Sequence, residues 1–507
     1  MRRYRPKTMR LGKSRYSQRR ARALWLIGAA LGVAAVVAIA VLAFGGEGGA
    51  PPAQTAASMP ALTPTPAASP TPAPTFTSTP TPGAVQTAAM RTRYNASVEA
   101  VQNVGESYID MSRGYHLLCR EEVVYTNPTG DELWEVYLRF YPCAVEANCV
   151  TVTAAAVNGR QAYYELNADG TLLMLPLTEP LAPGGVASIY LEYRVDMPRD
   201  DGRFGASDYG LMLGGLLATV AHCGESGWDT RAYVDYGDPF WWEFADYTVS
   251  LEANAGFLAA ATAPEQSVSV EGNRATWLYS ASNVRDFCIA LCRDFRVHEF
   301  EVSGQRVALY ANGASEELNM VREVCEQALG YFIERFGELP FERVCIVRNA
   351  MDGAMEYPGL IMLSSRYWFE ANRSQTEVLL SHELAHQFWS CAVGNSQYDD
   401  AYIDEGLATF CSYMFIKEIH SEEYMVRAWE IELAGVSPDE CDYTRSLPEY
   451  ADAQDYYDSV YRAAALRLME LRESEGEERL FGRLRALYAA FLGKTVSAED
   501  FERLLTG

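Results

Sequence analysis

Two histidines and a glutamate stand at a spacing that could hold a metal ion and activate water. The run Val378–Trp389 contains His382-Glu383-x-x-His386. If this run is helical, the two histidines project from one face, and both imidazoles could bind one zinc ion. Glu383 would lie beside the same site but angled away from ligation, where a carboxylate can take a proton from zinc-bound water.

A third ligand candidate follows along the chain. Glu405 comes after eighteen intervening residues, in the run Tyr402–Ala408. Two histidines and one glutamate leave the fourth position of zinc open, which is the arrangement of a catalytic rather than a structural site. The sequence therefore predicts one zinc ion per chain. The other four histidines stand at no metal-ligand spacing and are expected to be structural or exposed: His116, His222, His298 and His420.

The elements that position these residues can be read from hydrophobic spacing. Ser374–Glu377 has the pattern of a capping box, so the helix of the histidine pair should begin there. Apolar residues at three- and four-residue spacing predict helices over 316–336 and 461–473, and 343–348 is strand-like. A catalytic domain is expected from 300 to 507.

The preceding segment has the pattern of β structure. Short apolar runs at 133–141, 186–195, 245–251 and 274–279 are separated by turn signals. This spacing predicts an antiparallel β-sandwich domain over 93–299. Most of the eleven cysteines are expected to pack as small hydrophobic residues, although Cys143 and Cys149 could bridge across a loop.

The N-terminal region has the composition of a membrane anchor. Residues 1–22 carry ten basic and no acidic side chains and are expected to be cytoplasmic. Residues 23–44 carry no charge and would form a transmembrane helix of roughly 33 Å. A Pro/Thr-rich linker follows over 45–92. The expectation is a single-pass protein of the cell membrane with an extracytoplasmic catalytic domain; a cleaved signal peptide is the alternative.

The charge balance bears on partners. The formal net charge is −25, although ten of the 42 basic residues lie in the first 22 positions. A body this acidic repels phosphate backbones, so no nucleic acid is expected as a partner. The oligomeric state is not readable from the sequence.

Together these motifs resemble a known family. The His382–His386 motif followed by Glu405 is similar to that of the gluzincin metallopeptidases, and specifically of the M1 aminopeptidase family. Upstream, Gly353–Tyr357 reads G-A-M-E-Y, where the family form is G-A-M-E-N. Downstream, Tyr461 opens a segment that looks like the family's Y-E-K-G-A, and Tyr456 precedes it by five residues.

The resemblance implies chemical roles for the matching residues. His382, His386 and Glu405 would ligate zinc, and Glu383 would be the general base. Tyr461 would donate a hydrogen bond to the oxyanion of the tetrahedral intermediate.

The resemblance also implies a substrate-binding set. Glu356 would accept the free α-amino group of the substrate, so that the enzyme counts from the N-terminus. The backbone of Gly353 and Ala354 would pair with an extended peptide. Met355 and Tyr456 would complete this set.

The implied fold class is α+β: the transmembrane helix, the β-sandwich, and a thermolysin-like α/β zinc peptidase domain with a helical C-terminal part. The family's large C-terminal helical domain would be absent. Tyr357 in place of Asn, and residues 462–464 in place of E-K-G, bear on specificity. No counterpart of the family's second amine-holding side chain is evident in the β domain.

The expected function is that of a membrane-anchored zinc metallopeptidase that releases N-terminal amino acids from peptide substrates. Endo- or dipeptidyl cleavage at the same site is one alternative. A non-catalytic peptide-binding scaffold is the other.

Overall fold

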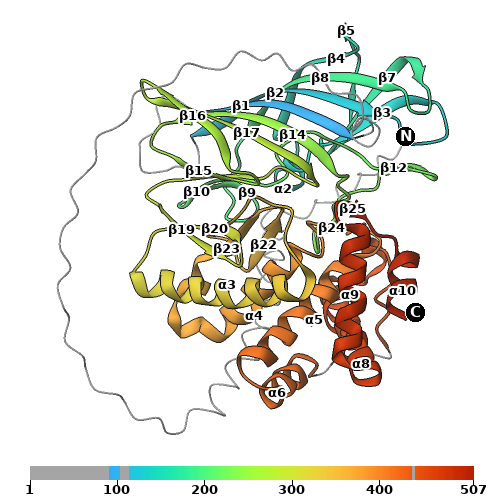
Figure 1. Cartoon of the computed structure of the whole chain (residues 1–507). Coiled ribbons are helices and arrows are strands. Elements are labelled where there is room, and N and C mark those ends of the chain that lie inside the picture. The colour runs from blue at the N-terminus through green and yellow to red at the C-terminus, as the bar shows by residue number, and fades with distance from the viewer. Residues whose placement is uncertain (1–90, 103–113, 435, 437–439, 507) are drawn as a thin grey trace, which may run out of the picture.

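The computed structural model describes residues 91–102, 114–434, 436 and 440–506. In Figure 1, a β half (residues 91–295) lies above a mixed half (residues 296–506) in which helices predominate. The basic segment 1–22, the apolar run 23–44 and nearly all of the predicted linker 45–92 lie outside the described residues.

The expected membrane location is corrected by the structure. Among the helices of the described ranges, none is both long enough and apolar enough to cross a bilayer. The two longest, α3 (Ser315–Phe336) and α5 (Ala401–Ile419), carry acidic and basic side chains along their length. This finding overturns the expected single-pass location and extracytoplasmic catalytic domain, whose predicted span lies outside the described residues.

A large sheet dominates the β half. Its eight strands run in the order β16-β17-β14-β1-β2-β8-β4-β5. They are β1 (Thr92–Gln102), β2 (Tyr115–Thr126), β4 (Val150–Val157), β5 (Arg160–Gln161), β8 (Val186–Asp196), β14 (Ala245–Asn254), β16 (Glu265–Glu271) and β17 (Arg274–Val284). Neighbours are antiparallel as expected, except that β1 pairs with β14 in parallel. The long excursion between these two strands makes room for the crossover that a parallel pair needs.

Smaller sheets complete the β half. One has the order β11-β3-β7-β6 and another β15-β18-β10-β9. Their strands are β3 (Leu133–Arg139), β6 (Glu165–Leu166), β7 (Leu172–Leu181), β9 (Phe204–Ser207), β10 (Gly210–Leu213), β11 (Thr219–Val220), β15 (Leu258–Ala261) and β18 (Ile289–Cys292). A short helix, α2 (Pro142–Val145), and a two-stranded ribbon of β12 (Cys223–Gly224) and β13 (Gly227–Trp228) accompany them.

The mixed half is built on a five-stranded sheet of order β19-β20-β21-β23-β22. Its strands are β19 (Arg296–Val302), β20 (Gln305–Ala311), β21 (Arg343–Asn349), β22 (Ala354–Tyr357) and β23 (Leu360–Ser364). A domain boundary between 299 and 300 would fall inside β19. Buried side chains of this sheet and of the β15-β18-β10-β9 sheet form one shared core, including Met212, Cys288 and Met362, which joins the two halves.

Helices cover the face of this sheet that is turned away from the β half (Figure 1). Besides α3 and α5, the mixed half contains α4 (Arg373–His386), α6 (Glu422–Glu432), α7 (Ala453–Tyr457), α8 (Ala464–Glu475), α9 (Glu477–Phe491) and α10 (Ala498–Thr506). A π-helix spans Asp458–Ala463, and 3-10 turns span Ser365–Trp368, Glu370–Asn372 and Leu447–Glu449. The short strands β24 (Val393–Gly394) and β25 (Lys494–Thr495) tie the α4–α5 connection to the C-terminal region.

The predicted helix start at Ser374 is wrong by one residue, and the capping box does not form. Helix α4 begins at Arg373 after a 3-10 turn, and its N-cap Asn372 makes no side-chain cap. Glu377, whose carboxylate would close the box, pairs with His420 at 2.9 Å instead. A tertiary partner has therefore taken a side chain that the local cap would use.

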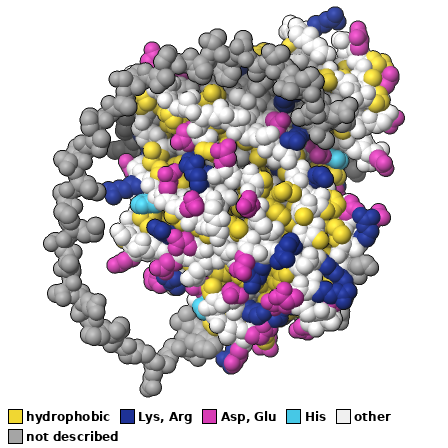
Figure 2. All heavy atoms as spheres, viewed as in Figure 1, with side chains coloured by type: hydrophobic (Ala, Val, Ile, Leu, Met, Phe, Trp, Pro, Cys, Tyr) yellow, Lys and Arg dark blue, Asp and Glu magenta, His cyan; other side chains and the backbone are white. Residues whose placement is uncertain are grey.

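Acidic and basic side chains are interspersed over the helical region of the face seen in Figure 2. Several of them join different helices: Arg472 contacts Glu422 at 2.6 Å and Glu477 at 2.8 Å. Exposed pairs of this kind each contribute little to stability, about 0–1 kcal/mol. The helices are therefore held mainly by their buried apolar faces.

Replacing Glu121 of β2 by Gln should change how stability depends on pH. Glu121 is buried and accepts hydrogen bonds from Tyr193 Oη at 3.0 Å and Ala218 N at 3.1 Å. Burial raises the pKa of Glu121 from 4.5 to about 8, so the folded chain retains a proton that the unfolded chain releases between these values. Its contribution to the free energy of unfolding is full below the lower value and declines as pH rises through this window.

In Glu121→Gln this decline should disappear. Urea unfolding measures the free energy of unfolding at about pH 5 and at about pH 8. The difference between these two free energies should be smaller in the variant than in the parent chain. Glu122→Gln, an exposed neighbour on the same strand, is the matched control. An unchanged difference in Glu121→Gln would contradict the prediction.

Candidate active site

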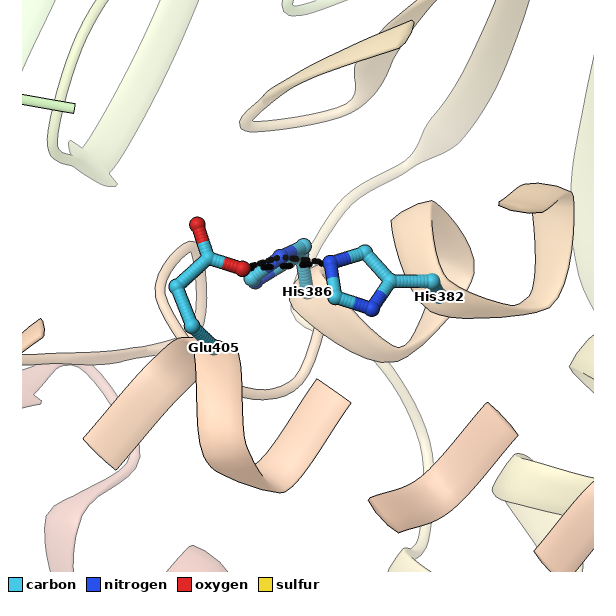
Figure 3. A group of neighbouring side chains, drawn as sticks. All are labelled: His382, His386 and Glu405. Carbon is cyan, nitrogen blue, oxygen red and sulfur yellow. Dashed lines mark hydrogen bonds and ion pairs between the residues drawn. The ribbon is translucent and has the colours of Figure 1, made fainter. Parts of the chain in front are cut away.

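The three predicted metal ligands meet at one point. His382 and His386 project from one face of α4, and Glu405 reaches them from α5 (Figure 3). Glu405 Oε2 lies 3.1 Å from His382 Nε2 and 3.2 Å from His386 Nε2, and the two Nε2 atoms are 2.9 Å apart. The four-residue helical spacing and the α4–α5 packing together create this cluster.

The donor set fits a tetrahedral zinc ion. Ligands at about 2.0–2.2 Å from zinc lie about 3.3–3.6 Å from one another, slightly wider than the separations found here. His386 Nδ1 lies 3.0 Å from the Trp389 carbonyl, which accepts its proton and leaves Nε2 as the free lone pair. The side chain of His382 is 13% exposed, against 2% and 3% for His386 and Glu405, so the centre opens to solvent beside His382.

The electrostatics of the cluster favour a cation. Burial would raise the pKa of Glu405, but the charge on His386 and hydrogen bonds from both imidazoles lower that pKa below its usual range. Burial and the neighbouring His386 lower the pKa of His382. Burial alone would lower the pKa of His386 too, but the charges on Glu356 and Glu405 raise it well above its usual value. Glu405 is therefore ionised and His382 neutral, as metal ligation needs, whereas His386 would release a proton when a metal binds.

Glu383 lies next to the ligands without joining them. It is 5% exposed, and its Oε2 has no hydrogen-bond partner among the described residues. Burial raises the pKa of Glu383 above its ordinary range, and Glu405 adds to the rise. The free oxygen is the atom that can accept a proton, and a cation bound at the neighbouring ligands would favour the ionised form of Glu383 that this requires.

The G-A-M-E-Y run forms the edge strand of the five-stranded sheet. Gly353 has φ +98°, a conformation that favours glycine, and β22 follows with antiparallel pairing to β23. Alternation along the strand separates its side chains, so Glu356 faces the metal cluster while Met355 packs in the shared core. Tyr357 is also in that core, where its ring lies 6.3 Å from Trp242.

Glu356 is a buried carboxylate near the metal centre. It is 6% exposed, and Gln397 Nε2 donates to its Oε1 at 3.2 Å. Burial raises its pKa well above the ordinary value, the charge on His386 opposes the rise, and the negative charges of Asp238 and Glu383 add to it. The position therefore favours a cationic ligand.

Tyr461 lies within the π-helix and points to the metal cluster. Its hydroxyl donates to Glu405 Oε1 at 2.7 Å, and its ring stacks 5.9 Å from that of His382. The sequence pattern predicted an ordinary helix here. Arg462 reaches Glu432 at 2.8 Å and Asp458 at 2.7 Å, contacts that hold the wider turn.

Tyr456 is 2% exposed and lies behind Tyr461, with the two rings 6.0 Å apart. It packs over Gly237 of the β half, where an added Cβ would come within 2.8 Å of the Tyr456 ring. Its hydroxyl has no partner among the described residues. In this structure the Tyr456 side chain therefore packs against the β half.

Asp238 is a site residue that the sequence analysis missed. It comes from the β half, is 8% exposed, and accepts from Arg203 Nη1 at 2.7 Å. Burial is the largest cause of the raised pKa values of Glu356 and Glu383, and the negative charge of Asp238 adds to both rises. The run Gly237-Asp238-Pro239 reads only as a turn, so no sequence signal indicated it.

One aspartate holds together the segments that line the centre. Asp399, in the α4–α5 connection, accepts from Arg231 of the β half at 2.9 Å. It also accepts from Ser446 Oγ at 2.9 Å, in the segment leading to the π-helix. Asp238, Gln397 and Tyr461 lie on these three segments, so Asp399 links the walls of the site.

Comparison with known proteins identifies the mixed half. Residues 316–507 match the peptidase family M1 domain. Aminopeptidase M1-A of Oryza sativa subsp. japonica is 24% identical over 280 residues, which cover 50% of this chain and 31% of that protein. Endoplasmic reticulum aminopeptidase 1 of Mus musculus is 24% identical over 260 residues, covering 48% and 28%. The chain therefore spans about a third of the length of these relatives.

Solved structures share the fold of both halves. The M1 zinc metallopeptidase from Deinococcus radiodurans superposes with a TM-score of 0.58 at 17% identity, covering 82% of this chain and 90% of that one. A variant of that enzyme bound to a Tyr-Ser-Ala substrate gives 0.56 at 18% identity, with the same coverage. The resemblance seen in the sequence motifs is confirmed. Together with the donor set, these relatives indicate zinc as the metal.

Replacing His386 by Gln should remove the metal. The parent chain, dialysed after expression, should retain about one zinc ion in elemental analysis. His386→Gln deletes one of three converging ligand atoms and should retain little. His116→Gln, a half-buried histidine on β2, is the control and should keep the parent content. Full zinc retention in His386→Gln would refute the ligand assignment.

Proposed function

Because residues 316–507 form a peptidase family M1 domain, we propose that the chain is a zinc-dependent metallopeptidase that releases N-terminal amino acids from peptides. The observation that carries this proposal is the convergence of His382, His386 and Glu405 beside the unpartnered Glu383 carboxylate. A bound zinc ion supplies Lewis acidity and makes water nucleophilic at neutral pH.

Two residues of this chain then supply proton transfer and a hydrogen-bond donor. Glu383 accepts the proton of the attacking water at its unpartnered carboxylate oxygen and passes it to the leaving amine. Tyr461 supplies a hydroxyl donor beside the ligands. In this structure that hydroxyl is turned to Glu405, 2.7 Å away, and a rotation would aim it at a developing oxyanion.

Charge at the site supports recognition of a free N-terminus. Three buried glutamates, Glu356, Glu383 and Glu405, share the site with two buried aspartates, Asp238 and Asp404. Two guanidinium groups offset part of this negative charge. One belongs to the buried Arg285, and the other to Arg203, which is paired with Asp238. A zinc ion leaves an excess of negative charge, and the ammonium group of a peptide N-terminus is a ligand that offsets it.

Glu356 is the proposed anchor for that ammonium group, and the edge of β22 beside it is the proposed backbone guide. Gly353 and Ala354 lie at this edge, where an extended peptide could add as a further strand. The structural relative with Tyr-Ser-Ala bound, and the names of the aminopeptidase relatives, support exopeptidase over endo- or dipeptidyl cleavage. The converged ligands and the free base argue against a non-catalytic scaffold.

Glu383→Gln should stop turnover without releasing the metal. The amide keeps the size of the side chain but cannot accept a proton, so kcat should fall by about 10²-fold or more on every peptide. Zinc content, measured on the same sample, should stay at the parent level. Substantial activity in this variant would show that another group is the base.

Glu356→Gln should act on substrates with a free N-terminus. Removing the charge that faces a desolvated ammonium should lower kcat/KM for such peptides roughly 10²-fold. N-acetylated peptides should be poor substrates of the parent enzyme and lose little more. Glu377→Gln, a buried glutamate on α4 paired with His420, is the matched control and should keep the parent preference. Equal cleavage of free and acetylated peptides by the parent would contradict the anchor role.

A further inference from the structure

Gln397 is a buried amide aimed at the proposed amine anchor. It is 2% exposed, and its Nε2 donates to Glu356 Oε1 at 3.2 Å. Among the described side chains, Gln397 is the one that donates a hydrogen bond to this carboxylate. Because a carboxylate only accepts, the contact also fixes which end of the amide faces Glu356.

The backbone on either side of Gln397 is held by arginines of the β half. On one side, the buried Arg285 donates to the carbonyls of Ser390 at 2.9 Å and Asn395 at 2.6 Å. On the other, Asp399 pairs with Arg231 at 2.9 Å. Gln397 lies between these two anchors, so its amide has little freedom to move away from Glu356.

The group that donates to Glu356 is an uncharged amide, which leaves the charge of the carboxylate in place. An arginine or lysine at this place would neutralise Glu356 and compete with a cationic ligand. An amide orients one carboxylate oxygen, leaves the second available, and preserves the negative charge. The Gln397 Oε1 atom has no hydrogen-bond partner among the described residues, so the bond to Glu356 is the hydrogen bond that orients this amide.

We propose that Gln397 is a positioning residue that fixes the Glu356 carboxylate for the N-terminal ammonium group of the substrate. The proposal rests on the function proposed above, in which Glu356 is the amine anchor. Gln397 acts through Glu356 and is not placed at the reacting atoms.

Gln397→Met keeps the length of the side chain and removes the donor. It should raise KM for a peptide with a free N-terminus roughly ten-fold, since a hydrogen bond to a buried charge is lost. The value of kcat and the slow cleavage of the acetylated peptide should stay near those of the parent. Gln305→Met removes a buried amide that donates to the Arg306 and Phe341 carbonyls instead, and it should leave KM unchanged.

A double-mutant cycle separates positioning from a structural effect. In the Glu356→Gln background, Gln397→Met should add no further rise in KM, because the group through which it acts is already neutral. If Gln397→Met does not fold, Gln397→Asn, which withdraws the donor by one methylene, provides the same comparison. An unchanged KM in the single variant, or an equal rise in both backgrounds, would overturn the proposal.

Failure of the proposed function would give a different experimental result from failure of the Gln397 role alone. A parent enzyme that cleaves free and acetylated peptides equally well would refute the amine anchor, and this inference with it, before any Gln397 variant is made. A parent that discriminates strongly, together with a silent Gln397→Met, would overturn the positioning role alone.

Discussion

Negative charge concentrated in a buried space is the constraint that organises this molecule. Glu356, Glu383 and Glu405 lie within one site, and Asp238 and Asp404 add their charges to it. Desolvation makes such a cluster unfavourable unless cations enter or protons bind. In the function proposed above, these cations are a zinc ion at the two histidines and the substrate ammonium group at Glu356. The amides of Gln397 and Asn395 and the hydroxyl of Tyr461 hydrogen-bond to Glu356, Asp404 and Glu405 without neutralising them, whereas Arg203 pairs with Asp238.

The site belongs to both halves of the chain. The mixed half carries the metal ligands and the edge strand, whereas the β half contributes Asp238 and the two arginines, Arg231 and Arg285, that hold the α4–α5 connection. A shared apolar core beneath the site joins the sheets, so these polar contacts rest on a packed interface. Because the two halves pack together, the charge of Asp238 in the β half can raise the pKa of Glu356 in the mixed half.

The relatives reported above are distant in sequence. Solved structures at 17–18% identity share the fold of both halves, and curated aminopeptidases at 24% identity match about half of this chain. Two local features of this chain follow from its own contacts. Tyr357, where the family motif has Asn, fills the shared core next to Trp242, and the turn that holds Tyr461 is wound as a π-helix pinned by Arg462.

The sequence alone predicted the cluster of His382, His386 and Glu405 and the outline of the fold. A four-residue repeat on a helix places His382 and His386 on one face whatever surrounds them, and period-2 and period-3.6 patterns indicate strands and helices locally. Tertiary structure decided what these patterns do not encode. The helix start, the π-helix and the parallel β1–β14 pair all follow from partners distant in the chain. Asp238 and Gln397 carry no motif. The docking of the two halves brings Asp238 to the site, and the path of the α4–α5 connection brings Gln397 to Glu356, because burial and charge act through space rather than along the chain.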